Sequence, residues 1–546
     1  MLTGEGGLFP LGATMRDGVE IPYILTAPPT LIEYFAHFCA QHGDKTFLVD
    51  GEERLSFAQA HALAVRVSKG LLERHGVARG DRIGIAMRNA SAWVIAYMAV
   101  TMAGGVATLL NGWWQTRELD EAIADTTTSL VLADGPRAER LAEGAGIAPV
   151  IRCDLTGGTQ AAFESLLGAD EVVLPIIDAH DYATILFTSG STGASKGAFS
   201  THRSVVQGAF NYLVQTSSML IIATEDGRAP TLQPATIVNT PLFHVTAEVP
   251  TFLQSFGMGR KLVMMPKWDA EAAMRLIEDE QITYFVGVPL MSFEMLTHER
   301  RGEYDLSSCA LFAAGGAPRP SEHVKRLAEG MGGGQPALGY GLTETNAVGT
   351  GNISTNYLDK PDSAGMASRP LVELGIFDDA GERLRDDQTG EIGIRSIANF
   401  EGYWGNEAAT RAAFTADRFF LTGDLGYIDA DGYLYIVDRK KDIIIRGGEN
   451  ISGLEVEAVI YEHPDVAECS VFGLPDAKFG EVPAAVVHFR DGAGDENTVR
   501  DFLRPRLAPY KVPERIWISA EALPRGGTEK IDKKALREAY RRALEA

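Results

Sequence analysis

Strand-like and helix-like segments alternate through the first half of this chain. The runs Arg82–Met87 and Ser129–Ala133 have the apolar character of buried strands, and a helix is expected to begin at Ser91 between them. This alternation is typical of an α/β fold. A chain of 546 residues is also too long for one hydrophobic core. We therefore predict an α/β protein that divides into at least two domains.

Local signals predict where some of the helices begin. Ser56 is expected to cap a helix that runs to about His75, because the apolar residues after it repeat on one face. Thr116 is expected to cap a shorter helix over residues 117–123. The long apolar run Trp93–Leu110 contains a glycine pair, so we interpret it as a buried helix followed by a strand rather than a membrane span.

The sequence changes character after Gly390. Short strands separated by acidic turns, such as Asp429–Gly432 before Tyr433–Val437, indicate a β-rich subdomain. The charged cluster Asp438–Asp442 then precedes about a hundred residues, the size of a small α+β domain. We therefore predict a large domain over residues 1–438 and a small domain over residues 439–546.

Composition excludes several classes of protein. The formal net charge is −23, which argues against non-specific binding to nucleic acid or to anionic lipid. The four cysteines have no C-x-x-C spacing, so neither a disulfide framework nor a zinc site is expected. The N-terminal residues lack the pattern of a secretory signal, so we expect a cytoplasmic protein, with peripheral membrane contact and a homodimer left open.

A segment rich in glycine and hydroxyl groups follows the apolar stretch Asp181–Phe187. It reads T-S-G-S-T-G-A-S-K-G, and its backbone N–H groups, hydroxyls and lysine suit a polyphosphate. The P-loop pattern G-x-x-x-x-G-K-[ST] does not fit, because Ser195 and Gly197 stand where that pattern needs Gly and Ser or Thr. We predict a different phosphate-binding loop, with a flexible linker as the alternative. The candidate residues are Thr188, Ser189, Gly190, Ser191, Thr192, Gly193 and Lys196.

A second polar cluster, Gly339–Thr345, is also suited to a nucleotide. Tyr340 can stack on a purine, Thr343 can bond a phosphate, and Glu344 is the oxygen ligand that Mg²⁺ prefers beside phosphate oxygens. Upstream, Ala313–Pro318 is a small-residue passage against which a flat ring can lie. The alternative for each segment is an ordinary glycine-rich turn.

One carboxylate and one cation further along complete the set. Asp424, in Thr422–Asp424, is placed to bond a ribose diol, and Arg439 can supply a cation for the same sugar or its phosphate. The alternatives are a surface turn and a surface ion pair.

Together and in this order, these segments resemble the adenylate-forming superfamily, which includes acyl- and aryl-CoA synthetases. The motifs that carry the resemblance are T-S-G-S-T-G-A-S-K-G, G-Y-G-L-T-E-T, T-G-D and D-R-K-K-D-I-I-I-R-G-G-E-N, and the likeness extends from about Thr30 to Leu536. The resemblance implies a two-step reaction. A carboxylate attacks the α-phosphorus of MgATP to give an acyl-adenylate and pyrophosphate, and a thiol, usually that of coenzyme A, then displaces AMP.

The resemblance also implies a role for each candidate residue. The nucleotide is expected to be bound by the loop residues above and by Gly315, Gly316, Ala317, Gly339, Tyr340, Gly341, Thr343, Asp424 and Arg439. Glu344 and Thr188 are the expected Mg²⁺ ligands, Lys441 the hinge about which the small domain turns, and Gly447–Gly448 the contact with coenzyme A.

Two further residues are implied to act on the acid. Lys530 matches the lysine that bridges carboxylate and phosphate during adenylation, although Glu529 stands before it where the family usually has glycine. His244 occupies a position at which amino-acid-activating relatives carry an aspartate, so the substrate is expected to lack an α-amino group. With Lys530, His244, Glu344 and Thr343 as the catalytic set, the chain is expected to be an acid–CoA ligase.

The acyl pocket implied by the resemblance has a mostly small and aliphatic wall. It is expected to be apolar and fairly roomy, which suits a medium- or long-chain fatty acid or a bulky aryl or cyclic acid. An acyl-AMP ligase that loads a carrier protein and a relative impaired in turnover are alternatives. The pocket residues are His244, Val245, Val286, Ala313 and Gly315.

Overall fold

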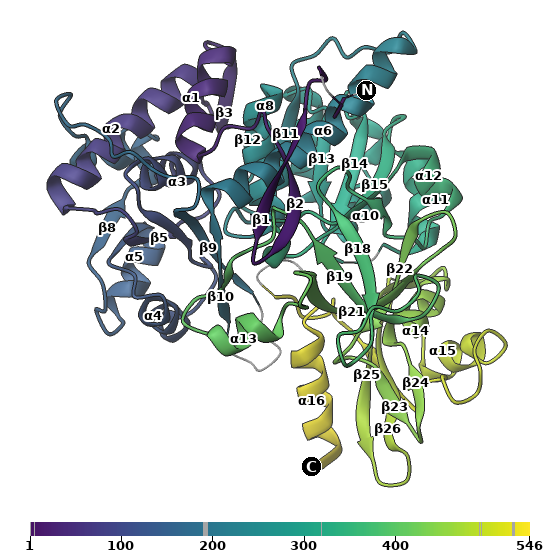
Figure 1. Cartoon of the computed structure of the whole chain (residues 1–546). Coiled ribbons are helices and arrows are strands. Elements are labelled where there is room, and N and C mark those ends of the chain that lie inside the picture. The colour runs from purple at the N-terminus through teal and green to yellow at the C-terminus, as the bar shows by residue number, and fades with distance from the viewer. Residues whose placement is uncertain are drawn as a thin grey trace.

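The computed structural model describes residues 2–545 except 5, 189–194, 318, 491, 493 and 527–529. Figure 1 shows an N-terminal half, in purple and blue, beside a teal and green half, with the yellow C-terminal residues below them. Helices and strands are mixed throughout, so the predicted α/β class is confirmed.

The first large sheet has seven strands among the described residues, in the order β20-β10-β9-β6-β5-β7-β8. Strands β5 to β9 that neighbour one another are parallel, whereas β10 runs antiparallel to β9 and to β20. The strands are β5 (Arg82–Ala86), β6 (Val106–Leu109), β7 (Leu130–Asp134), β8 (Val150–Cys153), β9 (Tyr182–Thr188), β10 (Lys196–Thr201) and β20 (Gly402–Tyr403). Helix α2 (Phe57–His75) precedes β5, and the helices between the strands that follow are α3 (Ser91–Met102), α4 (Thr116–Asp125) and α5 (Gly135–Ala142).

Most of the local predictions in this half are confirmed. Ser56 caps α2 by accepting a hydrogen bond from the amide of Gln59, and the run Trp93–Leu110 forms the buried helix α3 and strand β6. The predicted cap at Thr116 is wrong. Gln115 is the capping residue of α4, and the Thr116 hydroxyl inside the helix donates to the carbonyl of Arg140 instead.

A second sheet runs through the teal and green half and, within the described chain, has thirteen strands. Its centre is parallel, from β3 through β12, β11, β13 and β14 to β15. These strands are β3 (Thr46–Asp50), β11 (Ala235–Val238), β12 (Lys261–Met264), β13 (Tyr284–Gly287), β14 (Leu311–Gly315) and β15 (Gln335–Tyr340). The antiparallel strands beyond them are β4 (Glu53–Ser56), β16 (Thr350–Ile353), β17 (Gly365–Ala367), β18 (Glu373–Phe377), β19 (Gly390–Arg395), β21 (Phe420–Ile428) and β22 (Tyr433–Arg439).

Helices pack on this sheet and between the two halves. A buried aromatic cluster joins α1 and β3 to α8, because Tyr34, Phe35 and Phe47 are each in ring contact with Phe256. The helices are α1 (Leu31–His42), α6 (His202–Glu225), α7 (Val245–Ala247), a π-helix (Glu248–Leu253), α8 (Gln254–Met258), α9 (Ala270–Asp279), α10 (Pro289–Thr297), α11 (Ser321–Gly330), α12 (Ser354–Asp359) and α13 (Glu407–Ala412). A separate hairpin, β1 (Leu11–Arg16) and β2 (Val19–Ile24), lies near the N-terminus.

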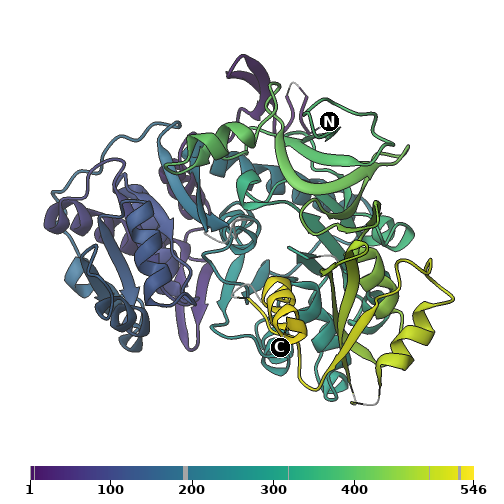
Figure 2. The ribbon, with the colours of Figure 1, turned by 90° about the horizontal axis from the view of Figure 1, so that it is seen from below.

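The C-terminal residues form a small unit with its own sheet and core. The chain leaves the thirteen-stranded sheet at Arg439 and enters the new sheet at Ile444. Figure 2, seen from below, shows α16 near the middle of the molecule, and its Leu536 packs with Phe472 and Leu474 of this sheet. The elements are β23 (Ile444–Arg446), β24 (Glu449–Ile451), α14 (Gly453–Tyr461), β25 (Val466–Asp476), β26 (Gly480–Phe489), α15 (Glu496–Leu503), β27 (Arg515–Ser519) and α16 (Lys533–Glu545).

Candidate active site

The candidate site lies where the parallel strands of the second sheet end. Gly315 ends β14 and is paired in register with Gly339 near the end of β15, and His244 follows β11 on the same edge. Ligands of open α/β sheets bind at this carboxyl edge of the strands. A Cβ at Gly339 would meet nothing described that is nearer than the Thr350 carbonyl oxygen at 4.0 Å, so local packing leaves this backbone open to a flat group.

His244 is partly buried at this edge, and its ring is neutral. It begins α7, and its Nδ1 accepts a hydrogen bond from the Thr246 amide at 3.3 Å. Burial, with the nearby charge of Lys530, lowers the pKa of His244 to about 3. Because Nδ1 is the acceptor, the proton of the neutral ring lies on Nε2, which is thereby a hydrogen-bond donor.

Lys530 comes from the C-terminal unit and lies directly against Gly316. A Cβ at Gly316 would stand 2.8 Å from both Cε and Nζ of Lys530, and Gly316 has a φ of +77°, which also favours glycine. Burial and the charge of Arg439 lower the pKa of Lys530 to about 8, whereas Asp424 opposes that change. The terminal lysine, predicted from sequence, is therefore brought to His244 and the nucleotide residues.

Three of the nucleotide candidates are joined by one hydrogen bond and one ion pair. Tyr340 donates its hydroxyl to Oδ2 of Asp424 at 2.8 Å, and Nε of Arg439 lies 3.5 Å from Oδ1 of the same carboxylate. Adjacent strands explain this, because Asp424 of β21 is paired in register with Arg439 of β22. Burial raises the pKa of Asp424 against the opposing charge of Arg439.

The residue before Arg439 ties this group to the C-terminal unit. Oδ2 of Asp438 lies 3.1 Å from the Ser452 hydroxyl and accepts from the Leu454 amide at 3.3 Å, at the start of α14. Asp438 is itself buried.

Glu344 is buried and bonded by a residue that the sequence did not single out. The Tyr403 hydroxyl donates to Oε1 of Glu344 at 2.8 Å, and Nζ of Lys196 lies 4.9 Å from the centre of the Tyr403 ring. Burial raises the pKa of Glu344, although the Tyr403 bond opposes the change. Tyr403 was missed because its local signal, one tyrosine in an aromatic stretch, is not specific.

The predicted phosphate loop connects two antiparallel strands. Thr188 ends β9 and is paired in register with Lys196 at the start of β10. The loop's Ser189, Gly190, Ser191, Thr192 and Gly193 lie outside the described residues. In a P-loop a strand leads into a helix, whereas the segment here lies between two strands, in agreement with its distinction from that pattern.

The donor set fits a magnesium ion held together with phosphate oxygens. Mg²⁺ in nucleotide sites is usually bound by one or two carboxylates plus substrate phosphates. Glu344 supplies a carboxylate whose Oε1 is already oriented by Tyr403, and Thr188 adds a hydroxyl on β9. Among the described residues, no group of three or more His, Cys, Asp or Glu is arranged as a metal site.

The predicted acyl pocket has the expected wall but little free volume. Val286, Ala313 and Ala337 form one apolar cluster against which Tyr284 and Leu311 pack. The expected roomy pocket is not found in this structure, because the cavity beside His244 has a volume of about 10 Å³. The residues that line it include Thr246, Val288, Gly315 and Lys530, so the lysine itself helps to fill it.

Several predicted residues are not brought to this cluster. Lys441 is exposed between β22 and β23. Gly447 and Gly448 form the exposed turn between β23 and β24, and the Gly447 amide donates to the Phe479 carbonyl. Glu529 lies outside the described residues.

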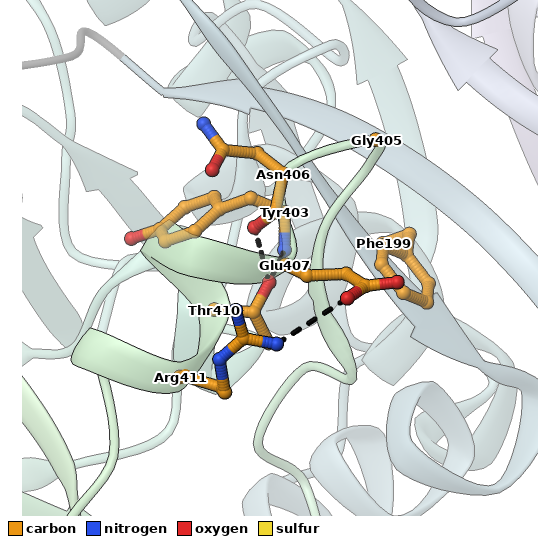
Figure 3. A pocket seen from close by; sticks show the side chains of 7 residues that line it. All are labelled: Phe199, Tyr403, Gly405, Asn406, Glu407, Thr410 and Arg411. Atoms are coloured by element: carbon orange, nitrogen blue, oxygen red, sulfur yellow. Dashed lines mark hydrogen bonds and ion pairs between the residues drawn. The ribbon is translucent and has the colours of Figure 1, made fainter.

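A larger surface cavity of about 560 Å³ lies beside Tyr403 (Figure 3). In this cavity Glu407 and Arg411 of α13 point toward one another and form an ion pair of 3.3 Å. Phe199, which also lines the cavity, lies near the Glu407 side chain. Because Tyr403 also bonds Glu344, this cavity adjoins the Glu344–Lys196 side of the site.

Comparison with known proteins agrees with this geometry. The family model of the AMP-binding enzymes matches residues 35–404, and that of the AMP-binding enzyme C-terminal domain matches residues 455–530. The chain is 33% identical to the long-chain-fatty-acid–CoA ligase FadD13 of Mycobacterium tuberculosis, over 89% of this chain and 93% of the relative. It is 34% identical to a feruloyl-CoA synthase of Amycolatopsis sp, over 90% and 95% of the two chains.

Solved structures give the same result. ATP-bound MatB from Rhodopseudomonas palustris matches with a TM-score of 0.81 and 29% identity, over 93% of this chain and 99% of that one. The o-succinylbenzoate CoA synthetase of Bacillus subtilis, in complex with its acyl-adenylate intermediate, matches with a TM-score of 0.78 and 27% identity, over 94% and 99%. No helix among the described residues is long and apolar enough to cross a membrane.

The family models and the relatives together show that the chain belongs to the adenylate-forming AMP-binding enzymes and, within them, to the acid–CoA ligases.

Proposed function

We propose that this enzyme activates a hydrophobic carboxylic acid without an α-amino group, and transfers it from the acyl-adenylate to coenzyme A. The observation that carries the proposal is the position of Lys530, which lies against Gly316 and within electrostatic reach of His244, Asp424 and Arg439. A cation there joins the acid-binding side of the site to the nucleotide-binding side.

The first half-reaction requires positioning and charge neutralisation. The acid's carboxylate oxygen forms a bond to the α-phosphorus while the bond to pyrophosphate breaks, and negative charge builds up between Lys530 and Thr343. Asp424 and Arg439 hold the ribose, and Tyr340 lies against the adenine. Glu344 and Thr188 would hold Mg²⁺, which supplies further positive charge at the phosphate oxygens when bound.

His244 supports the choice of acid. Its neutral ring presents Nε2–H as a donor, which suits a carboxylate oxygen and offers nothing to an ammonium group. The apolar cluster of Val286 and Ala313 beyond it favours a hydrophobic chain or ring, a fatty acid or a bulky aryl or cyclic acid. The named activities of the relatives, long-chain fatty acid and feruloyl, span the same range.

The second half-reaction is assigned to a different position of the C-terminal unit. We place the division of the chain at residues 438 and 439, with Lys441 as the hinge. Gly447 and Gly448 lie on an exposed turn, which leaves their backbone free to contact coenzyme A after rotation. The thiol then attacks the acyl carbon, AMP leaves, and the thiol proton is released.

We further propose that the protein is cytoplasmic. The four cysteines are buried and unpaired, as expected for a reducing compartment. A homodimer and peripheral membrane contact are checked by light scattering and by vesicle flotation.

The proposal is tested by AMP formation with coenzyme A across fatty, aryl, cyclic and α-amino acids. We expect turnover with hydrophobic acids and none with α-amino acids. The proposed function would be contradicted if AMP formed only with a carrier protein as the acceptor, or if none of the acids in the panel caused pyrophosphate release. Lys530→Ala should abolish pyrophosphate release and leave thioester formation from supplied acyl-adenylate.

A further inference from the structure

Arg260 is a buried cation that has no carboxylate partner within the described part of the chain. It is 4% exposed and precedes β12. Its Nη1 makes two long hydrogen bonds of 3.4 Å, to the Pro250 carbonyl and to Oε1 of Gln254, and its Nε has no acceptor among the described residues. The groups that act on its charge are the phenols of Tyr284 and Tyr34, which are neutral at pH 7, and burial lowers the pKa of Arg260. Buried charges are normally paired, so this one is unusual.

Arg260 lies at the end of the predicted acyl-pocket wall that is farther from His244. Its guanidinium is 4.7 Å from the centre of the Tyr284 ring, and Tyr284 packs on the pocket cluster that contains Val286 and Ala313. Side chains two residues apart on a strand share a face, so Tyr284, Val286 and Val288 form one row. Val288 lines the cavity beside His244. The row therefore runs from the reacting end of the pocket to Arg260.

The surroundings of Tyr284 are polar as well as buried. Thr236 of β11 is paired in register with Tyr284, which puts the two side chains on the same face of the sheet. The Thr236 hydroxyl is buried without a hydrogen-bond partner among the described residues. Arg260 and Thr236 thus offer donors, and Tyr284 a phenol, at one end of the otherwise apolar wall predicted for the acyl pocket.

We propose that Arg260, Tyr284 and Thr236 form a polar end wall that binds a second carboxylate, at the far end of the acid substrate. This inference rests on the proposed function and names its substrate class, long acids with a distal carboxylate. The four residue steps from Val288 to Tyr284 span about 13 Å, so the two carboxyl carbons of an extended substrate should be about ten to eleven bonds apart.

The test compares dodecanedioic acid with dodecanoic acid, which differ in the distal carboxylate. Wild-type enzyme should release AMP from the diacid with the higher kcat/KM. Arg260→Met, which keeps the volume and removes the charge, should lower kcat/KM for the diacid about 10- to 100-fold and leave the monoacid nearly unchanged. Tyr284→Phe keeps the ring over Arg260 and should give a smaller loss for the diacid.

Arg319→Met is the matched control. Arg319 is also 4% exposed and also makes long bonds to neutral groups, to the Ala337 and Phe312 carbonyls and the Ser292 hydroxyl. It should change the two acids by the same factor. If Arg260 only stabilises the end of α8, Arg260→Met will likewise lower both acids equally, and that result would overturn the inference.

Calorimetric binding separates failure of this inference from failure of the proposed function. Both acids are titrated into wild type and Arg260→Met in the presence of AMP. If no acid supports AMP formation but the diacid binds wild type at least 10-fold more tightly than the variant, the end wall stands and the proposed function fails. Equal binding of the diacid by the two proteins overturns the end wall, whatever the turnover.

Discussion

The charge state of Lys530 should limit adenylation at alkaline pH. Burial and Arg439 bring its pKa down from 10.5 to about 8, which corresponds to about 3 kcal/mol against the charged form. In the proposed mechanism pyrophosphate release requires the ammonium of Lys530, so kcat/KM for ATP should be flat below pH 8 and fall about tenfold per pH unit above it. A lysine in an ordinary environment would keep this rate up to about pH 10.

Substitutions of the two flanking charges should move this midpoint in opposite directions. Asp424→Asn removes a charge that raises the pKa of Lys530 and should lower the midpoint by about one pH unit. Arg439→Gln removes a charge that lowers it and should raise the midpoint by a similar amount. Both variants should also bind ATP more weakly, so the quantity compared is the pH at the midpoint of the alkaline fall and not the absolute rate.

Pyrophosphate release between pH 6 and 10 provides the measurement. Lys533→Met is the matched control, because Lys533 is three residues away but is paired with Glu457 at 2.9 Å, and its midpoint should equal wild type. Thioester formation from supplied acyl-adenylate should not fall above pH 8. Shifts of the same sign in the two flanking variants, or an unchanged alkaline fall in Lys530→Ala, would refute the assignment.

Three further predictions follow from the same contacts. The pKa of Lys530 is lower in the folded protein than in the unfolded chain, so between about pH 8 and 10.5 the unfolded chain binds more protons and the stability of the wild type rises with pH. Lys530→Met should therefore have a higher Tm than the wild type at pH 7, and this difference in Tm should disappear by pH 10.5. Gly316→Ala should lower pyrophosphate release at least tenfold, since the new Cβ would stand 2.8 Å from the Lys530 side chain. Gly381→Ala is the control, because Gly381 also has a positive φ, +80°, but a Cβ there would meet open space, and it should leave the rate unchanged. Equal losses of rate in the two variants would contradict this prediction. Tyr403→Phe should raise KM for MgATP about tenfold, because it removes the hydrogen bond to Glu344. That bond lowers the pKa of Glu344, so its loss should also move the acid limb of the pH–rate profile to higher pH. A pH–rate profile identical to that of the wild type would exclude a role for Tyr403 in orienting Glu344.

Local signals in the sequence predicted local structure well. The cap of α2 and the break after α3 depend on residues within a few positions of each other, and both are found. The cap of α4 was placed one residue late, because Gln115 rather than Thr116 has the extended backbone of a capping residue. Such differences of one residue are beyond what side-chain preference alone can resolve.

Contacts between distant segments could be predicted only where a motif marked them. His244, Asp424 and Lys530 carry motif positions, and the structure brings them together from three parts of the chain. Arg260 and Tyr403 have no such mark, since their importance comes from the side chains of β13 and the 3-10 turn Thr343–Thr345 that fold against them. The pairing of β3 with β12, over two hundred residues apart, has no local signal either.

The hydrogen bonds of Asp438 connect the nucleotide residues with the C-terminal unit. Asp438 is bonded at the start of α14, and the next residue along β22 is Arg439, which pairs with Asp424. A displacement of α14 is therefore transmitted to Asp424 and Arg439, the proposed ribose-binding pair, through one peptide unit. By thermodynamic reciprocity, a nucleotide that fixes Arg439 must also favour one orientation of the C-terminal unit, and that orientation must tighten nucleotide binding by the same factor.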